Sequence, residues 1–324
     1  SNVLNGGRVS EARRKLVEAS IEKLGYQVNT LAKGMRMQKT DYVVVILPNL
    51  INPYFALLLD ALESELSAVG KQVLLCLSGD DAEREVAFMD MAKQNKVDGI
   101  IGVTYSKVEE ERIENMAFVS IDRHYKSHIP CVAGDNWQGG WLAAENLHKR
   151  GSTNLLCFMT MSSVDSEVRK RRVGFTEYCM EHDLSCNSVE MSEKQIVSVY
   201  ESYGSRKLIH NMLRAYISPS MGEHSIDGIF TSSDHLATIV QEELEEMGKR
   251  VPEDIQIIGY DGLQFLNQGK PIVSSIAQPV HEIAKEAVRC LNELIANGKT
   301  EGNTKIPVSF QEGPTTKTLV TEEK

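Results

Sequence analysis

The sequence predicts an α/β fold in which a small helical N-terminal segment precedes two lobes, each a doubly wound parallel sheet. Short apolar runs alternate with helical patterns along most of the chain, which is typical of parallel strands covered by helices on both faces. The 324 residues, 42% of them hydrophobic, are enough to bury two cores. Residues 1–40 hold eight basic and three acidic side chains, a net charge of +5, whereas the remainder holds 27 and 42, a net charge of −15. A basic segment on an acidic body favours attraction to a polyanion at that end.

The first expected helix runs from Glu11 to Leu24. Ser10 is a good N-cap, Glu11 lies in the first turn, and Gly25 can end the helix. Apolar side chains recur at helical spacing, at Leu16, Val17, Ile21 and Leu24. A second, cation-rich helical stretch follows the turn Leu24-Gly25-Tyr26.

The remaining elements form two sets separated near residue 141. Strands of the first set are expected at 42–47, 72–77, 99–103, 117–121 and 131–133, with helices at 53–69, 82–94 and 108–115. Strands of the second set are expected at 154–159, 228–230 and 255–260, with helices at 168–182, 204–215, 235–247 and 283–296. Because no strand leads through GxGxxG into a helix, a dinucleotide-binding fold is not supported.

Several function classes lack their signatures. No stretch approaches the roughly 20 apolar residues of a membrane span. The six cysteines show no CxxC or metal spacing and are interpreted as reduced core residues of a cytoplasmic protein, and the eight histidines form no ligand pattern. No GxSxG elbow, P-loop or paired catalytic set stands out. We therefore expect no metal, no cofactor, no membrane association and no catalytic residues.

Ordered short motifs occupy the N-terminal 40 residues. They are Val3-Leu4-Asn5-Gly6, Arg8-Val9-Ser10, Leu24-Gly25-Tyr26, and Asn29 followed by Ala32, Lys33 and Met35. This series resembles the third helix and hinge of the LacI/GalR (lactose-repressor) family. The resemblance implies that the sequence given begins inside a helix-turn-helix, with 1–28 the end of a DNA-binding headpiece and 29–41 a hinge helix and linker. The implied DNA contacts are Asn5, Arg8, Asn29, Ala32, Lys33 and Met35. The alternative is an ordinary surface helix and linker.

The resemblance continues through the body of the chain. Its motifs follow the family order: Asn52-Pro53-Tyr54-Phe55, Val97-Asp98-Gly99, Ile121-Asp122-Arg123, Gly134-Asp135-Asn136 with Gly139-Gly140, Arg171 with Gly174-Phe175, Val251-Pro252-Glu253, Gly259-Tyr260-Asp261 and Gln278-Pro279. It implies periplasmic-binding-protein-like lobes that are discontinuous in sequence. Lobe one is expected at 42–140 plus 274–300, and lobe two at 141–273 plus 301–324. A ligand cleft is expected between them, where the carboxyl ends of both sheets meet.

Polar and aromatic residues at those strand ends suit a sugar. Asp, Asn and Arg side chains can each hold adjacent hydroxyls, while aromatic rings cover an apolar sugar face. The ligand positions implied by the resemblance are Asn52, Tyr54, Phe55, Asp122, Arg123, Asn136, Arg171, Asp261 and Gln278. Arg169, two residues before Arg171, is expected to point elsewhere.

Each position also has a structural interpretation. Tyr54 and Phe55 could begin a core helix, Asp122 and Arg123 could form an exposed ion pair, Asn136 could cap a helix, Arg171 could belong to a solvated cationic face, and Asp261 could be a turn residue. The sequence also departs from the family pattern, with Ser233-Asp234 in place of Asn-Asp. The segment 184–203 matches poorly, so the aromatic residue of the cleft from that region could be Tyr200, Tyr203 or neither.

The predicted function is a sugar-responsive transcriptional repressor of the cytoplasm. It would bind operator DNA as a homodimer, and a small carbohydrate or sugar phosphate between the lobes would change operator affinity. One alternative is a sugar-binding protein of the ribose-binding type without DNA binding. The other is an enzyme with a two-lobed body.

Overall fold

The structure is a computed structural model that describes residues 9–24, 40–79, 81–107, 109, 112–113, 116–125, 129–161, 164–217, 225–264, 268–300 and 302–319. The chain divides into two compact units, Ser1–Asp41 and Tyr42–Lys324. Within the described residues, no helix is both long and apolar enough to cross a membrane.

The N-terminal unit contains α1, Glu11–Leu24, with the predicted bounds. The backbone N–H of Arg14 donates to the Ser10 carbonyl at 3.0 Å. None of the described α1 side chains is buried, and Leu16 and Leu24 are 73% and 78% exposed. The expected second helical stretch and the implied DNA contacts Asn5, Arg8, Asn29, Ala32, Lys33 and Met35 lie outside the described residues.

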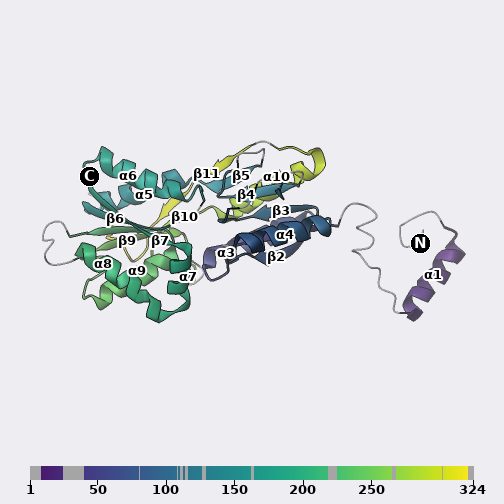
Figure 1. Cartoon of the computed structure of the whole chain (residues 1–324), viewed down its shortest axis with the longest axis horizontal. Coiled ribbons are helices and arrows are strands. Elements are labelled where there is room, and N and C mark those ends of the chain that lie inside the picture. The colour runs from purple at the N-terminus through teal and green to yellow at the C-terminus, as the bar shows by residue number, and fades with distance from the viewer. Residues whose placement is uncertain are drawn as a thin grey trace. The chain divides into compact units, whose positions relative to one another are not determined.

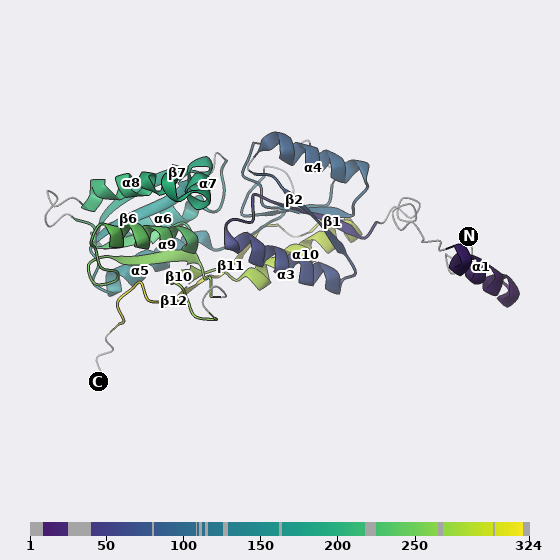
Figure 2. The ribbon, with the colours of Figure 1, turned by 90° about the horizontal axis from the view of Figure 1, so that it is seen from below.

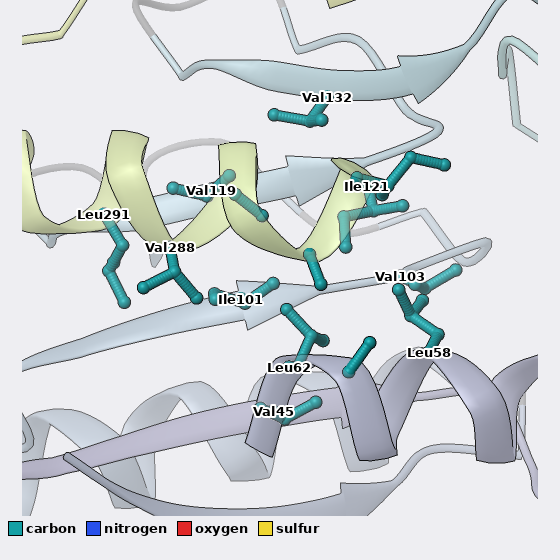
Figure 3. Packing of buried hydrophobic residues seen from close by; sticks show 14 of the residues in the cluster. Val45, Leu58, Leu62, Ile101, Val103, Val119, Ile121, Val132, Val288 and Leu291 are labelled. Atoms are coloured by element: carbon teal, nitrogen blue, oxygen red, sulfur yellow. The ribbon is translucent and has the colours of Figure 1, made fainter. Parts of the chain in front are cut away.

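The first sheet of the larger unit has the strand order β11-β5-β4-β3-β1-β2, and all its pairs are parallel. Its strands are β1 Tyr42–Leu47, β2 Gln72–Leu77, β3 Gly99–Gly102, β4 Phe118–Ile121, β5 Cys131–Gly134 and β11 Thr304–Ile306. Figure 2 shows α4, Ala82–Gln94, on one face, with α3, Pro53–Ala68, and α10, Val280–Asn297, on the other. Figure 3 shows the core under α3 and α10, where Leu58, Leu62 and Leu291 meet strand valines. Both faces are covered, which explains the continuous apolar strands.

The second sheet has the order β12-β10-β9-β8-β6-β7, with only β12 antiparallel to its neighbour among the described strands. Its strands are β6 Asn154–Met161, β7 Ser185–Ser192, β8 Gly228–Thr231, β9 Gln256–Asp261, β10 Ser274–Ala277 and β12 Ser309–Gln311. One face packs against α5, Asn136–Lys149, and α6, Arg169–Glu181. The other packs against α7 Glu193–Glu201, α8 Lys207–Ile217 and α9 Asp234–Glu246 (Figure 1). A 3-10 helix, Tyr203–Arg206, precedes α8.

The chain passes between the lobes at positions that differ from the predicted boundaries. Helix α5 belongs to the second lobe from Asn136 onward, where the sequence placed the boundary after 140. Strand β10 pairs with β9, so residues 274–277 lie in the second sheet rather than in lobe one. Strand β11 pairs with β5, so residues 304–306 lie in the first sheet rather than in lobe two. Strand β11 is placed by pairing with β5, which is distant in sequence, whereas β10 pairs with β9, the strand before it in the chain.

Two predicted regions differ in secondary structure. The helix expected at 108–115 is only partly within the described residues, and Arg112 and Ile113 there are not α-helical. Strand β7 and helix α7 were not predicted. Strand β7 is mostly exposed and polar because it is an edge strand, so it lacks the apolar run that marks a buried strand.

Candidate ligand-binding cleft

A cleft lies between the two lobes at the carboxyl ends of strands from both sheets. It has about 750 Å³ of empty space, open solvent at its mouth included. Seven of the nine predicted ligand residues line it, namely Asn52, Tyr54, Phe55, Asp122, Arg171, Asp261 and Gln278. This is where parallel α/β sheets place ligands, because the loops after the strands converge there.

The first lobe contributes the start of α3. The Asn52 side chain caps this helix, its Oδ1 accepting from the Tyr54 backbone N–H at 3.1 Å, and Pro53 follows in the first turn. Tyr54 and Phe55 are 4% and 7% exposed, and they belong to the core as well as to the cleft wall. The Tyr54 hydroxyl has no hydrogen-bond partner among the described residues. Burial raises the pKa of this phenol, with further contributions from Asp122 and Asp261, so it remains a neutral donor.

Asp122 follows β4 directly and has a left-handed conformation, with φ of 61°. It is 2% exposed, and Asn136 Nδ2 lies 3.4 Å from its Oδ1. Its carbonyl accepts from the Glu167 N–H at 2.8 Å, which connects the first lobe to the segment before α6. Burial raises the pKa of Asp122 to about 6, although the positive charge of Arg171 opposes the rise. The carboxylate therefore faces the cleft in an environment that favours added hydrogen-bond donors.

Arg171 enters the cleft from the first turn of α6. It is 5% exposed; its Nε donates to Asn136 Oδ1 at 2.6 Å and its Nη1 to the Ser232 carbonyl at 2.7 Å. The guanidinium lies 3.5 Å from the centre of the Tyr260 ring, in cation–π geometry. The alternative of a solvated cationic face is wrong for Arg171.

Two glycines fix the helix that carries Arg171. A Cβ on Gly140 of α5 would lie 1.8 Å from the Arg171 carbonyl oxygen, and one on Gly174 of α6 would lie 2.0 Å from the Trp137 carbonyl oxygen. Only glycine permits this backbone approach. Gly140 and Gly174, both part of motifs noted in the sequence, therefore allow the close backbone contact through which α5 positions α6.

Asp261 and Gln278 contribute unfilled acceptors. Gln278 Nε2 donates to Asp261 Oδ1 at 2.9 Å, and both side chains are buried. Asp261 Oδ2 and Gln278 Oε1 have no hydrogen-bond partner among the described residues. Burial raises the pKa of Asp261 to about 7, against the charge of Arg171 and the Gln278 hydrogen bond. A buried acceptor without a donor is costly, so a ligand that supplies hydroxyl donors would stabilise this end of the cleft.

The other two predicted ligand residues do not line the cleft. Arg123 turns into the first lobe, where its Nη1 donates to the Ser106 carbonyl at 2.6 Å and its guanidinium stacks on Tyr125. Asn136 is fully buried and bridges Asp122 and Arg171. An exposed Asp122–Arg123 ion pair is also wrong, since both are buried. The cap of α5 is Asp135, whose Oδ1 accepts from the Gln138 N–H at 3.0 Å.

Sequence reasoning missed several lining residues. They include Asn49, Tyr105, Thr160, Ser166, Val168, Arg169, Ile196, Ser232 and Ser233. Arg169 is exposed but borders the cleft, so the expectation that it points elsewhere is wrong. Ser232 and Ser233 follow β8, and the strand-end rule that found Asp261 could have found them.

Of the two aromatic candidates from segment 184–203, Tyr200 lies at the cleft and Tyr203 does not. It lines the cleft, its hydroxyl lies 3.0 Å from Ser233 Oγ, and its ring stacks on His235 at 4.0 Å between centroids. Tyr203 is 68% exposed and hydrogen-bonds to Glu246 instead.

An ion cluster joins the lobes beside the cleft. The Glu167 carboxylate is 1% exposed, and it contacts His124 of the first lobe and Lys170 of α6. Lys305 of β11 lies 3.8 Å away. Burial alone would raise the pKa of Glu167, but hydrogen bonds from Lys170 and His124 hold it below the usual value. The cluster therefore connects elements of both lobes through one carboxylate.

One group within the described part of the chain has metal-ligand residue types. His210, Glu243 and Glu246 lie together on α8 and α9, away from the cleft. His210 Nδ1 is 3.1 Å from Glu243 Oε2, and the Tyr203 hydroxyl donates to Glu246 at 2.6 Å. These atoms already form a network of protein hydrogen bonds.

Comparison with known proteins adds independent information. Residues 144–316 match the family model of the periplasmic binding protein-like domain. The chain is 31% identical over 317 residues to the sucrose operon repressor of Pediococcus pentosaceus, covering 97% of the chain and 93% of that protein. It is 30% identical over 293 residues to the ribose operon repressor of Halalkalibacterium halodurans, covering 90% and 84%. A periplasmic binding protein/LacI transcriptional regulator from Alkaliphilus metalliredigens QYMF, complexed with D-xylulofuranose, superposes with a TM-score of 0.72 at 26% identity, covering 86% of this chain and 100% of that chain.

Proposed function

Because the chain belongs to the LacI/GalR family of transcriptional regulators, we propose that it is a sugar-responsive operon repressor. It acts in the cytoplasm on DNA and is not an enzyme, in keeping with relatives that are repressors. Its effector is a small carbohydrate held between the lobes. The DNA contacts proposed from the motifs are Asn5, Arg8, Asn29, Ala32, Lys33 and Met35.

One observation carries the choice of effector. Four buried polar atoms of cleft residues have no partner among the described residues: the hydroxyls of Tyr54 and Ser166, Asp261 Oδ2 and Gln278 Oε1. Gln278 Oε1 can only accept hydrogen bonds, and Asp261 Oδ2 can only accept them when the carboxyl group is ionised, so hydroxyl donors of a ligand would satisfy both. Phe55, Val168 and Tyr200 add apolar surface for the C–H faces of a sugar ring.

Charge favours an uncharged sugar at this end of the cleft. Asp122 and Asp261 both face it, and a phosphate group has acceptor oxygens where these residues require donors. The charge of Arg171 is already shared among Asn136, the Ser232 carbonyl and the Tyr260 ring. Arg169 borders the cleft at an exposed position and is the group that would accept an anionic substituent.

The proposed mechanism is a population shift between arrangements of the two lobes. A sugar that bridges first-lobe Tyr54 and Asp122 to second-lobe Arg171 and Asp261 binds best when the lobes are close. A homodimer reads two operator half-sites through two symmetric hinges, so a change in lobe arrangement alters operator affinity. The coupling is reciprocal. If the sugar changes operator affinity by a given factor, operator DNA changes sugar affinity by that same factor.

A thermal-shift screen tests this function. The purified protein is heated with neutral pentoses, hexoses and disaccharides, and with the phosphate ester of each. A neutral sugar at about a hundredfold excess over its dissociation constant should stabilise the protein by about 2.7 kcal/mol, and its phosphate should do less. The protein should return the sugar chemically unchanged. Stabilisation by no carbohydrate, or conversion of the sugar to a product, would contradict the proposal.

A further inference from the structure

Three of the six cysteines gather under α6 in the second lobe. Cys157 of β6 and Cys179 of α6 belong to one buried cluster, and Cys186 of β7 packs against it. The other three, Cys76, Cys131 and Cys290, belong to elements of the first lobe. None of the six lines the cleft, so ligand binding does not account for the cluster.

The turn between α6 and β7 brings Cys186 back towards Cys179. The Leu184 N–H donates to the Cys179 carbonyl at 2.9 Å, and β7 begins at the next residue, Ser185. Side chains alternate along a strand, so Leu184 and Cys186 point to the same face. Both are half-buried, whereas Ser185 and Asn187 are exposed. Cys186 therefore faces the helix that carries Cys179.

The two thiols belong to the same packed region but have different surroundings. Cys186 packs against the cluster that contains Cys179, and its Sγ donates to the Asn187 carbonyl at 3.8 Å. Cys179 is 1% exposed, whereas Cys186 is half-buried on β7, an edge strand of the sheet. The neighbouring Cys179 thiol lowers the pKa of Cys186, whereas the Cys186 thiol and burial raise the pKa of Cys179. Cys186 is thus the more accessible and more acidic thiol, with a second thiol beside it.

We propose that Cys186 and Cys179 form a dithiol that hydroperoxides convert to a disulfide. The Cys186 thiolate attacks one oxygen of the hydroperoxide, the O–O bond breaks, and the departing oxygen takes a proton to leave as water or an alcohol. Cys186 is then a sulfenic acid. The Cys179 sulfur attacks the Cys186 sulfur, the S–O bond breaks, and water leaves with the Cys179 proton. Two thiols are oxidised by two electrons and one hydroperoxide is reduced.

The disulfide would join the last turns of α6 to the edge strand β7. Arg171 lies in the first turn of the same helix, so the modification acts on the element that carries a cleft residue. Such a reversible bond is compatible with a reducing cytoplasm, where disulfides are mostly transient and redox-sensing.

Peptide mass spectrometry tests the proposal on the unmodified chain. Between Arg172 and Lys194 there is no Lys or Arg, so trypsin releases residues 173–194 as one peptide with both cysteines. The reduced protein is treated with hydrogen peroxide, blocked with N-ethylmaleimide and digested without reductant. We expect this peptide to be about 2 Da lighter than its dithiol form and free of maleimide. Oxidation of Met180 and Met191 in the same peptide shows that the peroxide has reacted. A peptide that then still carries two maleimides would overturn the proposal, and so would a disulfide to Cys157.

Variants separate the roles of the two thiols. Cys179→Ser should stop the reaction at a Cys186 sulfenic acid, which dimedone traps. Cys186→Ser should leave Cys179 unreactive at the same peroxide dose. Cys157→Ser is the matched control and should still form the lighter peptide. Dimedone capture at Cys179 rather than Cys186 would contradict the assigned order.

Discussion

Asn136 and Arg171 join the two helices beside the cleft, the Oδ1 of the asparagine accepting from the Nε of the arginine at 2.6 Å. Asn136 also donates to the Gly134 carbonyl at 2.9 Å and approaches Asp122, so one buried amide orients a cation and an anion of the cleft. Residues that line the cleft are thus held by a residue that does not line it. Asn136→Asp should weaken sugar binding, because it removes the Nδ2 donor and places a second carboxylate beside Asp122; calorimetry with the identified sugar measures the loss.

The first prediction compares two arginines one position apart. Arg171→Ala removes a buried, hydrogen-bonded cation of the cleft, and we expect a loss of roughly 1.5 to 3 kcal/mol, or about ten- to a hundredfold in sugar affinity. Arg172 is the matched control because it is 42% exposed and pairs with Glu190 at 2.5 Å. Arg172→Ala should change affinity less than about twofold. Equal effects in titration calorimetry would remove Arg171 from the site.

The second prediction concerns the approach of α5 to α6. Gly140→Ala should reduce the free energy of unfolding by about 1 to 3 kcal/mol or more, since the new methyl must displace backbone. Gly204→Ala is the control, because the nearest atom to its added Cβ is 3.7 Å away. Urea unfolding of both variants provides the comparison. An unchanged midpoint for Gly140→Ala would mean that the helices are farther apart.

The third prediction follows from the raised pKa of Asp261, about 7 in the folded protein against about 3.9 in an unfolded chain. The folded state binds the proton more tightly, so this group stabilises the fold below pH 4, and its contribution decreases as the pH rises to about 7. Asp261→Asn should flatten the fall in unfolding free energy between about pH 4 and pH 7. Asp90→Asn, at a half-exposed position beside Arg112, is the control and should keep the wild-type slope. Identical slopes in all three proteins would contradict the assignment.

The fourth prediction has the opposite sign and concerns Glu167, whose pKa is held below normal despite burial. Its ion cluster contributes stability above the unfolded-state pKa of about 4.3, and that contribution is lost as the pH falls through the lower folded-state value. Glu167→Gln should cost about 1 to 3 kcal/mol near pH 7 and progressively less below about pH 4. Glu190→Gln, at a half-exposed pair, should cost little. A pH-independent difference in unfolding free energy would argue against an ionised Glu167.

Elements with a strong local sequence pattern were predictable whether or not they are buried. Strand β1 is buried and helix α1 has no buried side chain among its described residues, yet both have the predicted bounds, as do β2 and α4. Strand β7 was missed because an exposed edge strand does not need apolar residues. The sheet that β11 joins could not be predicted, since its partner β5 is distant in sequence, and the short strand β10 carries no pattern that assigns it to the sheet of β9.

The cleft was predictable where a strand end or a motif marks it, as at Asp122, Asp261 and Arg171. The sequence could not show which of the adjacent residues Asp122 and Arg123 lines the cleft. Asp122 lines the cleft, while Arg123 turns into the first lobe. Backbone conformation makes that choice, here through the left-handed φ of Asp122. Tyr200 lies on the unpredicted helix α7, so only the structure could select it over Tyr203.

The central claim is that the cleft and the DNA-binding segment are coupled in one regulator. The direct measurement is fluorescence anisotropy of the full-length protein on an operator selected from random DNA, with and without the sugar found by screening. We expect saturating sugar to change operator affinity by about 5- to 150-fold in the wild type, and much less in Arg171→Ala at the same sugar concentration. Operator affinity that stays the same when the cleft is saturated with sugar would contradict the account.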